Sequence, residues 1–127
     1  MNLILDYVVR TFGPFDFHVL MNTLFLADLS CHRLHGHTYV SSYKKTANGP
    51  YSAEIAEALY NTKGIQEIGS LGVFASTSEP RVLITPDDKF IKLLEDIELN
   101  YNKSRNLLLD VLDLPEVKNT EIGQIIV

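Results

Sequence analysis

The fold is decided by residues 20–59, which read LMNTLFLADLSCHRLHGHTYVSSYKKTANGPYSAEIAEAL. Apolar residues recur every three or four positions from Phe17 to Leu29, and this period predicts a long helix over residues 16–34. Asp16 is a suitable N-cap, because its carboxylate can accept hydrogen bonds from the first free backbone N–H groups. Gly36 follows the last turn and can adopt the left-handed conformation that ends a helix. The stretch therefore begins with the helix that we expect to be the spine of the fold.

The second half of this stretch predicts a strand, a turn and a helix. The segment His37–Lys45 alternates imperfectly and carries tyrosine and valine, which favour a β-strand. Asn48-Gly49-Pro50 then predicts a turn, because glycine supplies an unusual backbone angle and proline fixes the next one. Ser52 is a good N-cap, and the helix that it begins should end near residues 61–64.

The flanking segments complete a small mixed fold. Residues 3–8 have helical spacing, which stops at Gly13-Pro14. Pro86 marks the first position of a third long helix, which continues irregularly until Pro115. We therefore expect one α+β domain over residues 1–127, mostly helical, with a small β-hairpin or sheet in a winged-helix-like arrangement. The strands of that hairpin or sheet are predicted from three short apolar runs, Ile65–Ile68, Val73–Ala75 and Arg81–Ile84.

Composition and charge place the chain among ordinary globular proteins. Hydrophobic residues make up 46% of its 127 residues, and charged residues make up 21%. The net charge is −5, from 11 basic and 16 acidic residues, which gives no global attraction to a phosphate backbone. No apolar run reaches the length of a membrane span, and the first residues lack the pattern of a secretory signal. We therefore expect a cytoplasmic protein without a membrane partner.

One family pattern runs through residues 20–59. Its elements, in order, are Leu24-Phe25-Leu26-Ala27-Asp28, Gly36, Tyr39 and Gly49-Pro50-Tyr51-Ser52, followed by Glu54 and Leu59. In their order and gaps the chain resembles the Panacea domain, the SocA-like antitoxin family. The closing residues 121–126 resemble the short glycine-containing end of that domain. The resemblance implies a non-enzymatic module that binds a protein partner, such as a cognate toxin, and neutralises or presents it.

The expected partner surface is the strand and turn from Tyr39 to Tyr51 together with the hairpin from Ser70 to Arg81, because recognition residues concentrate on exposed edges and loops. A buried carboxylate must be paired, so for Asp28 we favour a structural bond to a loop backbone or to Tyr39 over contact with a partner. For Gly49-Pro50 we favour a backbone role in the turn. The candidate partner-binding residues are Asp28, Tyr39, Tyr43, Gly49, Pro50, Tyr51 and Ser52.

Side chains that could carry chemistry gather in residues 31–37. Cys31, His32, His35 and His37 include the only cysteine and three of the four histidines. Structural zinc sites usually join ligand pairs from separate segments, and the sequence has no second cluster, so helix-end histidines stabilised by the helix dipole are favoured. Metal binding by these residues stays an open alternative. A catalytic Cys31 would need a base and an orienting group, and no other catalytic pattern is present, so we expect neither an enzyme nor a cofactor.

The alternative function is that of a winged-helix transcriptional regulator. The helix over residues 53–60 would read the groove, yet it contains Glu54 and Glu57 and no arginine, lysine, glutamine or asparagine. The candidate DNA-binding residues near the predicted turn, the end of this helix and the hairpin are Lys44, Lys45, Lys63 and Arg81. A homodimer of the regulator would form through the last long helix, around Ile91, Leu94, Leu107 and Leu108.

Overall fold

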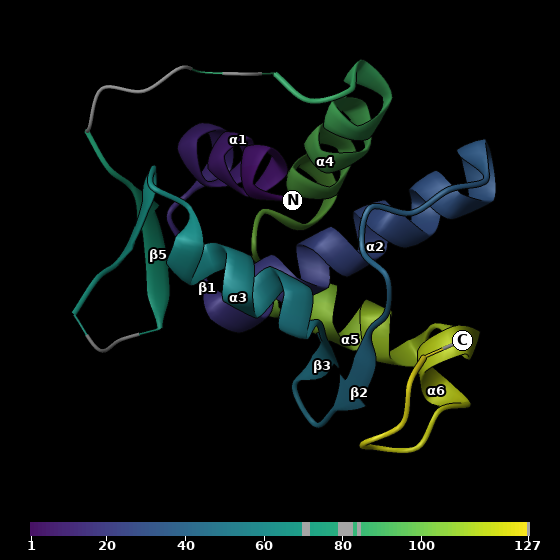
Figure 1. Cartoon of the computed structure of the whole chain (residues 1–127). Coiled ribbons are helices and arrows are strands. Elements are labelled where there is room, and N and C mark those ends of the chain that lie inside the picture. The colour runs from purple at the N-terminus through teal and green to yellow at the C-terminus, as the bar shows by residue number, and fades with distance from the viewer. Residues whose placement is uncertain (70–71, 79–82, 84, 127) are drawn as a thin grey trace.

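The computed structural model of the protein describes residues 1–69, 72–78, 83 and 85–126 (Figure 1). Its described part combines six helices with two small antiparallel sheets, which confirms the predicted α+β fold class. The helices are α1 (Asn2–Phe12), α2 (Phe17–His35), α3 (Ala53–Asn61), α4 (Asp88–Tyr101), α5 (Arg105–Asp113) and α6 (Pro115–Lys118). The strands are β1 (Phe15–Asp16), β2 (Lys44–Thr46), β3 (Gly49–Tyr51), β4 (Ile65–Glu67) and β5 (Val73–Ser76).

The helix ends that the sequence predicted are confirmed by their hydrogen bonds. The Asp16 carboxylate accepts from the backbone N–H groups of His18, at 3.0 Å, and Val19, at 3.3 Å. Gly36 ends α2 in the left-handed conformation, with φ of 80°. The Ser52 hydroxyl oxygen accepts from the backbone N–H of Ile55 at 3.2 Å and so caps α3. Each of these ends is fixed by residues only a few positions apart, which is why the sequence was sufficient to place them.

The larger sheet gives the fold its winged-helix-like order. Strands β4 and β5 form an antiparallel hairpin, and β1 pairs with the outer edge of β5 through Phe15 and Phe74. The helices α1, α2 and α3 precede this hairpin, and α1 packs against β5 and α3. The second hairpin, β2–β3, is inserted between α2 and α3 (Figure 1).

The strand predicted over His37–Lys45 is wrong for most of its length. Residues 37–43 have no regular structure and run back along α2 before β2 begins at Lys44 (Figure 1). The predicted turn is displaced as well, because it lies at Ala47–Asn48 while Gly49 and Pro50 belong to β3. Proline is tolerated there since β3 pairs with a neighbour on one side only.

The third long helix is divided in two. It begins after Asp87, whose carboxylate accepts from the backbone N–H of Lys89 at 2.8 Å, so Pro86 lies before the helix rather than at its first position. Asn102 and Lys103 have positive φ angles of 46° and 57°, which end α4 and separate it from α5. Of the predicted strand Arg81–Ile84, residues 81, 82 and 84 lie outside the described residues.

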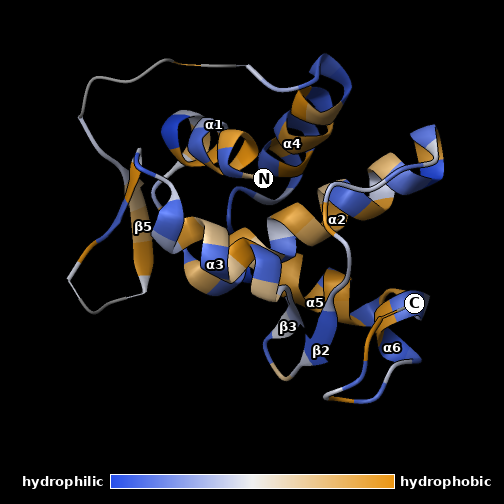
Figure 2. Cartoon of the chain, viewed as in Figure 1, coloured by the Kyte–Doolittle hydropathy of each residue, from blue (hydrophilic) through white to orange (hydrophobic). Residues whose placement is uncertain are grey.

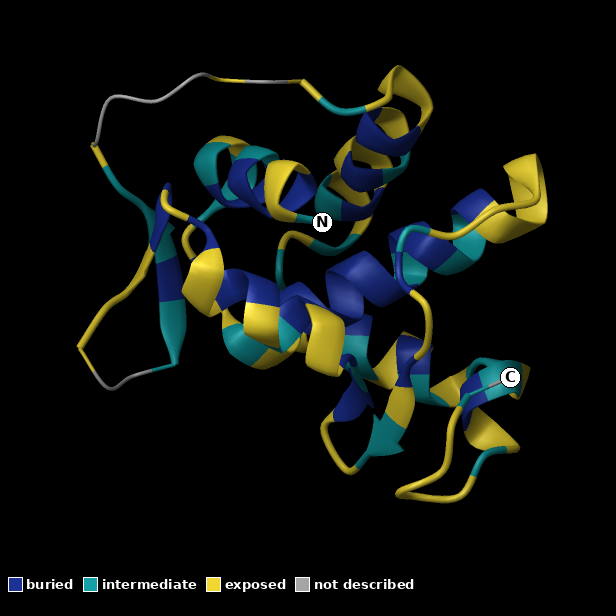
Figure 3. Ribbon diagram, in the orientation of Figure 1, coloured by how far each residue is buried: buried dark blue, intermediate teal, exposed yellow. Residues whose placement is uncertain are grey.

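Helix α2 is the spine of the fold, as its apolar period predicted. It packs against α4, α5 and β3, and every residue from Leu20 to Asp28 except Leu26 is buried. Apolar residues concentrate along this middle part of the helix (Figure 2), whereas its last turn is exposed (Figure 3). In the part of the chain that the structure describes, no helix has both the length and the apolar character needed to cross a membrane.

The side chains of the predicted dimer surface are buried or half-buried within the chain. Ile91, Leu94 and Leu107 are buried inside the chain's own core, and Leu108 is half-buried. Leu94 and Leu107 belong to the hydrophobic core of one copy of the chain, because α4 and α5 both lie against α2. They therefore do not form the exposed apolar face that the regulator's dimer would require.

Candidate functional site

Asp28 holds residues 37–43 against α2. Its side chain is only 2% exposed. One carboxylate oxygen accepts from the backbone N–H of Tyr39 at 2.6 Å, and the other accepts from the backbone N–H of Val40 at 3.1 Å and from the Tyr43 hydroxyl at 3.4 Å. The predicted structural bond from Asp28 to a loop backbone is therefore confirmed. These bonds also explain the missing strand, because the N–H groups of the loop are satisfied by a side chain of α2.

The electrostatics of Asp28 and Tyr43 follow from their burial. Burial raises the pKa of Asp28 above its usual value, although the hydrogen bonds from Tyr39, Val40 and Tyr43 act in the opposite direction. Burial, followed by the negative charge of Asp28, raises the pKa of Tyr43 well above its usual value. The Tyr43 ring also packs edge-on against Phe25, with ring centroids 4.9 Å apart. Asp28 and Tyr43 thus form a buried hydrogen-bonded contact that holds the loop against α2, and we call this contact the fastening.

Substituting Tyr43→Phe is expected to make the protein less sensitive to alkali. In the unfolded chain Tyr43 titrates near pH 10, whereas its pKa is well above that value in the fold. Such a group stabilises the fold fully below the unfolded pKa, and this contribution is lost as the pH rises towards the folded pKa. Between pH 9 and pH 11, urea denaturation should show that the wild type loses about 1.4 kcal/mol more unfolding free energy than the variant.

The matched control for this measurement is Tyr60→Phe. The Tyr60 side chain is 67% exposed on α3. Its substitution should therefore leave the decrease in unfolding free energy between pH 9 and pH 11 the same as in the wild type. Equal alkaline losses for the wild type and Tyr43→Phe would contradict the prediction, since they would mean that the Tyr43 hydroxyl ionises as easily in the fold as in the unfolded chain.

A groove of about 190 Å³ lies beside this fastening, and we call it the α2 groove. It is bounded by α2, by residues 38–43 and by residues of α6 and of the end of the described chain. Its rim residues Thr38, Ser41 and Ser42 are exposed, so the groove opens to solvent. The lining residues are Phe25, Asp28, Leu29, His32, Thr38, Val40, Ser41, Ser42, Tyr43, Glu116 and Ile126.

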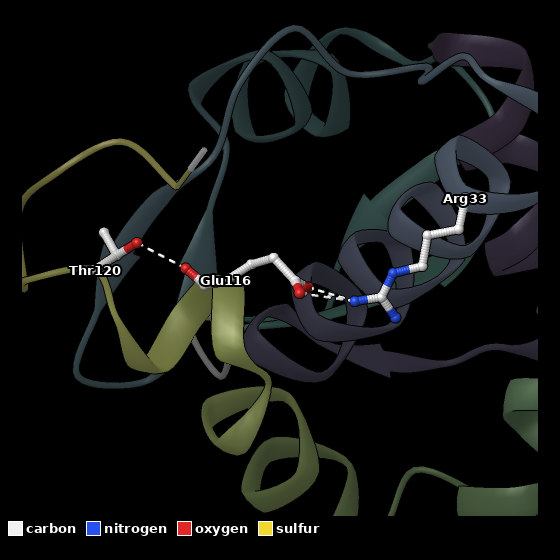
Figure 4. A network of polar contacts seen from close by, with 3 residues as sticks. All are labelled: Arg33, Glu116 and Thr120. Carbon is white, nitrogen blue, oxygen red and sulfur yellow. Dashed lines mark hydrogen bonds and ion pairs between the residues drawn. The ribbon is translucent and has the colours of Figure 1, made fainter.

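Glu116, which lines the α2 groove, forms an ion pair with a distant part of the chain (Figure 4). One terminal guanidinium nitrogen of Arg33, in the last turn of α2, donates to both carboxylate oxygens of Glu116 at 2.7 Å. The Thr120 hydroxyl donates to the backbone carbonyl oxygen of Glu116, also at 2.7 Å. Arg33 and Glu116 are 83 positions apart, so no local sequence signal could predict this contact.

Residues 121–126, which we call the closing segment, turn back against the β2–β3 hairpin and form a single antiparallel bridge, between Ile125 and Lys44. The backbone N–H of Lys45 donates to the carbonyl oxygen of Gln124 at 2.9 Å, and the N–H of Gly123 donates to the Lys45 carbonyl oxygen at 2.8 Å. The N–H of Ile126 donates to the carbonyl oxygen of Tyr43 at 2.8 Å. Sequence analysis missed this pairing, for which the β-branched pair Ile125-Ile126 is the available signal.

The predicted site residues of the Gly-Pro-Tyr-Ser motif form β3 and the N-cap of α3. Gly49 and Pro50 are buried in β3, and Ser52 is buried where it caps α3. Tyr51 is half-buried and lies near Phe17, with ring centroids 6.3 Å apart. Gly49, Pro50 and Ser52 therefore offer no side-chain surface to a partner, whereas Asp28, Tyr39 and Tyr43 meet at the loop beside the α2 groove.

The cysteine and histidines of residues 31–37 lie at the end of α2 and in the loop that follows it. Cys31 is buried, with its sulfur 3.7 Å from Nε2 of His37, while His32 lines the α2 groove. Burial raises the pKa of the Cys31 thiol, and the negative charges of Asp28 and Asp87 act in the same direction. This environment disfavours the thiolate that a nucleophile needs. Among the described residues, no group of three or more His, Cys, Asp or Glu side chains has an arrangement that could hold a metal ion.

The candidate DNA-binding lysines lie in two separate segments, β2 and the turn that follows α3. Lys44 is exposed and Lys45 is half-buried on β2, while Lys63 is exposed just after α3. Arg81 lies outside the described residues. The predicted groove reader, α3, has an acidic exposed face, because Glu54 and Glu57 are exposed on it together with Ala53, Tyr60 and Asn61. An acidic face opposes approach to phosphates.

Comparison with known proteins returned no match to this chain, whether against family models, curated proteins or solved structures.

Proposed function

We propose that this chain is a non-catalytic protein-binding module, of the kind that its resemblance to SocA-like antitoxins implies, and that it contacts its partner at the α2 groove. The observation that carries the proposal is the fixed loop beside that groove. Asp28 fastens residues 39–43 to the buried spine, so the exposed side chains of Thr38, Ser41 and Ser42 are held in place before any partner arrives. A preorganised loop reduces the entropy cost of binding.

The side chains around the α2 groove favour recognition over catalysis. Both carboxylate oxygens of Asp28 accept hydrogen bonds from the loop, and Glu116 is paired with Arg33. The Cys31 thiol is buried, and the surroundings that raise its pKa keep it protonated. Nε2 of His37 lies 3.7 Å from the Cys31 sulfur, but a buried, protonated thiol is not the accessible thiolate that covalent catalysis requires. Apolar walls and exposed hydroxyl groups are instead typical of a surface that binds another molecule.

A winged-helix regulator is the second candidate function, and the arrangement of α1, α2, α3 and the β4–β5 hairpin favours it. In such a protein α3 would enter the major groove of DNA. The exposed carboxylates of Glu54 and Glu57 on that helix oppose this docking. One of them is also engaged within the chain, because Glu54 accepts from the backbone N–H of Ser41 at 3.3 Å and from its hydroxyl at 3.2 Å. We therefore rank protein binding first.

Affinity purification from the native cells should separate the two functions. Ser42→Arg places a long charged side chain at the rim of the α2 groove without removing a buried group, and it should reduce a co-purifying protein at least tenfold. Asn106→Arg is the matched control, because Asn106 is exposed on α5, and it should retain the companion.

A variant with Lys44→Ala, Lys45→Ala and Lys63→Ala tests the regulator in the same experiment. Nucleic acid that is enriched with the wild type, released by salt and lost with this variant would place DNA binding first. A protein companion retained equally by the wild type and Ser42→Arg would remove the α2 groove as its binding site.

A further inference from the structure

The outer edge of β2 is already occupied in this structure by the closing segment, which turns at residues 122–124 and pairs with β2 at Ile125. The closing segment is bound there through the backbone groups of Tyr43 and Lys45, and Lys44 and Ile125 form an antiparallel bridge. It lies alongside β2 and passes near α6 (Figure 1). Such pairing needs only N–H and C=O groups on both sides, so it does not depend on the side chains of the added strand.

The closing segment buries little side-chain surface. Residues 121–125 are all exposed, with Ile122 at 67% and Ile125 at 50% exposure. Ile126 differs from them, because it is half-buried and lines the α2 groove. Apolar burial is the main favourable term in holding a segment in place, so this segment depends largely on three backbone hydrogen bonds and one side chain.

We infer that the β2 edge is a strand-addition site at which an extended segment of the protein partner replaces the closing segment. The inference rests on the proposed function and supplies its mode of binding. The partner's segment would pair with the backbone of Tyr43 and Lys45 and would place an apolar side chain at the position of Ile126. Within the full chain, the closing segment then competes with the partner's segment for the outer edge of β2.

The α2 groove defines which side chain fits at the position of Ile126. Phe25, Leu29 and Val40 provide apolar walls next to Ile126. The groove extends beyond Ile126, with about 190 Å³ of open space beside these apolar walls. A larger apolar side chain, such as phenylalanine, would therefore bury more apolar surface there than isoleucine.

Charge adds a second requirement on the partner's segment. Lys44 and Lys45 lie on the strand that receives it, and Lys44 is exposed. A carboxylate in the partner's segment is favoured next to these side chains, and a lysine or arginine is disfavoured. The occupant is therefore an extended, acidic segment with one apolar anchor, and the closing segment, with Glu121 and Ile126, is its counterpart within the chain.

Competition within the chain sets how the partner's affinity responds to substitutions. A tethered segment acts at an effective concentration of the order of millimolar. The partner binds only the fraction of molecules whose edge is open, so its apparent affinity falls by that fraction. Weakening the closing segment should therefore strengthen binding of a segment supplied in trans.

The test uses the full chain and a synthetic peptide of residues 121–126 with blocked ends. In Ile126→Asp a carboxylate replaces the anchor in the α2 groove, whereas the matched control Ile122→Asp changes an exposed position of the same segment. Titration calorimetry should show the peptide binding Ile126→Asp at least tenfold more tightly than the wild type or Ile122→Asp. A peptide carrying Ile126→Phe should bind more tightly still, and one carrying Ile126→Asp at least tenfold more weakly than the unmodified peptide. Near-ultraviolet circular dichroism checks that each protein variant is folded.

Hydrogen exchange of the wild type provides a measurement that needs no variant. The backbone amides of Lys45 and Ile126 should exchange at least 100-fold faster than that of Leu24 in the buried spine, because the closing segment opens without global unfolding. Equal protection at these positions, or equal peptide affinity for all three proteins, would overturn the inference. Dimers that the peptide dissociates would also overturn it, since the occupant of the edge would then be a second copy of the chain.

The native partner keeps this test separate from the proposed function. Excess peptide should release the co-purified protein from the wild type. A companion that is lost with Ser42→Arg but survives excess peptide would preserve protein binding at the α2 groove and reject strand addition.

Discussion

Asp28→Ala is expected to destabilise the fold by roughly 2–4 kcal/mol. The substitution leaves the backbone N–H groups of Tyr39 and Val40 and the hydroxyl of Tyr43 without their acceptor. An unpaired buried donor costs about 1–3 kcal/mol. Part of this cost is offset, because the burial that raises the pKa of Asp28 also penalises its charge in the fold. Urea denaturation at pH 7 measures the net loss.

Two further variants show whether the loss comes from the fastening. Asp28→Asn keeps one acceptor oxygen but points an amide group at one of the loop donors, so its stability should lie between those of the wild type and Asp28→Ala. Asp96→Ala changes an exposed carboxylate on α4 and should alter stability by less than about 0.5 kcal/mol. In Asp28→Ala the amides of Tyr39 and Val40 should also exchange faster with solvent. A loss below about 1 kcal/mol with unchanged exchange would contradict the role assigned to Asp28.

Gly49→Ala is expected to cost roughly 2–4 kcal/mol, for a reason unrelated to any partner. Gly49 has φ of 104°, a conformation that residues with a side chain rarely adopt. A Cβ atom at this position would collide with the side-chain oxygen of Asn22. Asn22 cannot easily move away, because its amide nitrogen donates to the carbonyl oxygens of His18, at 2.7 Å, and Asn48, at 3.2 Å. Thermal or urea denaturation measures the effect.

Gly36→Ala separates backbone strain from this collision. Gly36 also has a positive φ, of 80°, but nothing lies within 4 Å of a Cβ built on it. Its substitution should therefore cost only the strain of the left-handed conformation, about 1 kcal/mol. The difference between the two variants reports the collision with Asn22. Equal losses would show that Asn22 gives way and that the hairpin tolerates a side chain at position 49.

The features that could be predicted from the sequence are those that residues close together in the chain determine. Asp16, Gly36 and Ser52 each fix a helix end through groups within a few positions, and all three helix ends were predicted. The loop over residues 37–43 was predicted as a strand because its composition favours one. A side chain from another element, Asp28, takes the N–H groups on which a strand would depend.

The candidate site shows the same division. Burial physics alone indicated that Asp28 must have a partner, and the loop backbone that it binds was the favoured one. The motif Gly49-Pro50-Tyr51-Ser52 was predicted to bind a partner because of its family-like order. Gly49, Pro50 and Ser52 are instead buried, in β3 and at the start of α3. The Arg33–Glu116 pair joins residues 83 positions apart, and such a contact leaves no period or spacing to detect.

The fastening at Asp28 has a consequence for how this surface can diversify. The bonds that fix the shape of the loop come from a buried carboxylate, while the outward-facing side chains of Thr38, Ser41 and Ser42 lie on the rim. Exposed residues of this kind change at little cost to stability, whereas the buried anchor does not. Descendants of one ancestral chain could therefore acquire new partners by exchanging rim residues and keep the same spine and fastening throughout.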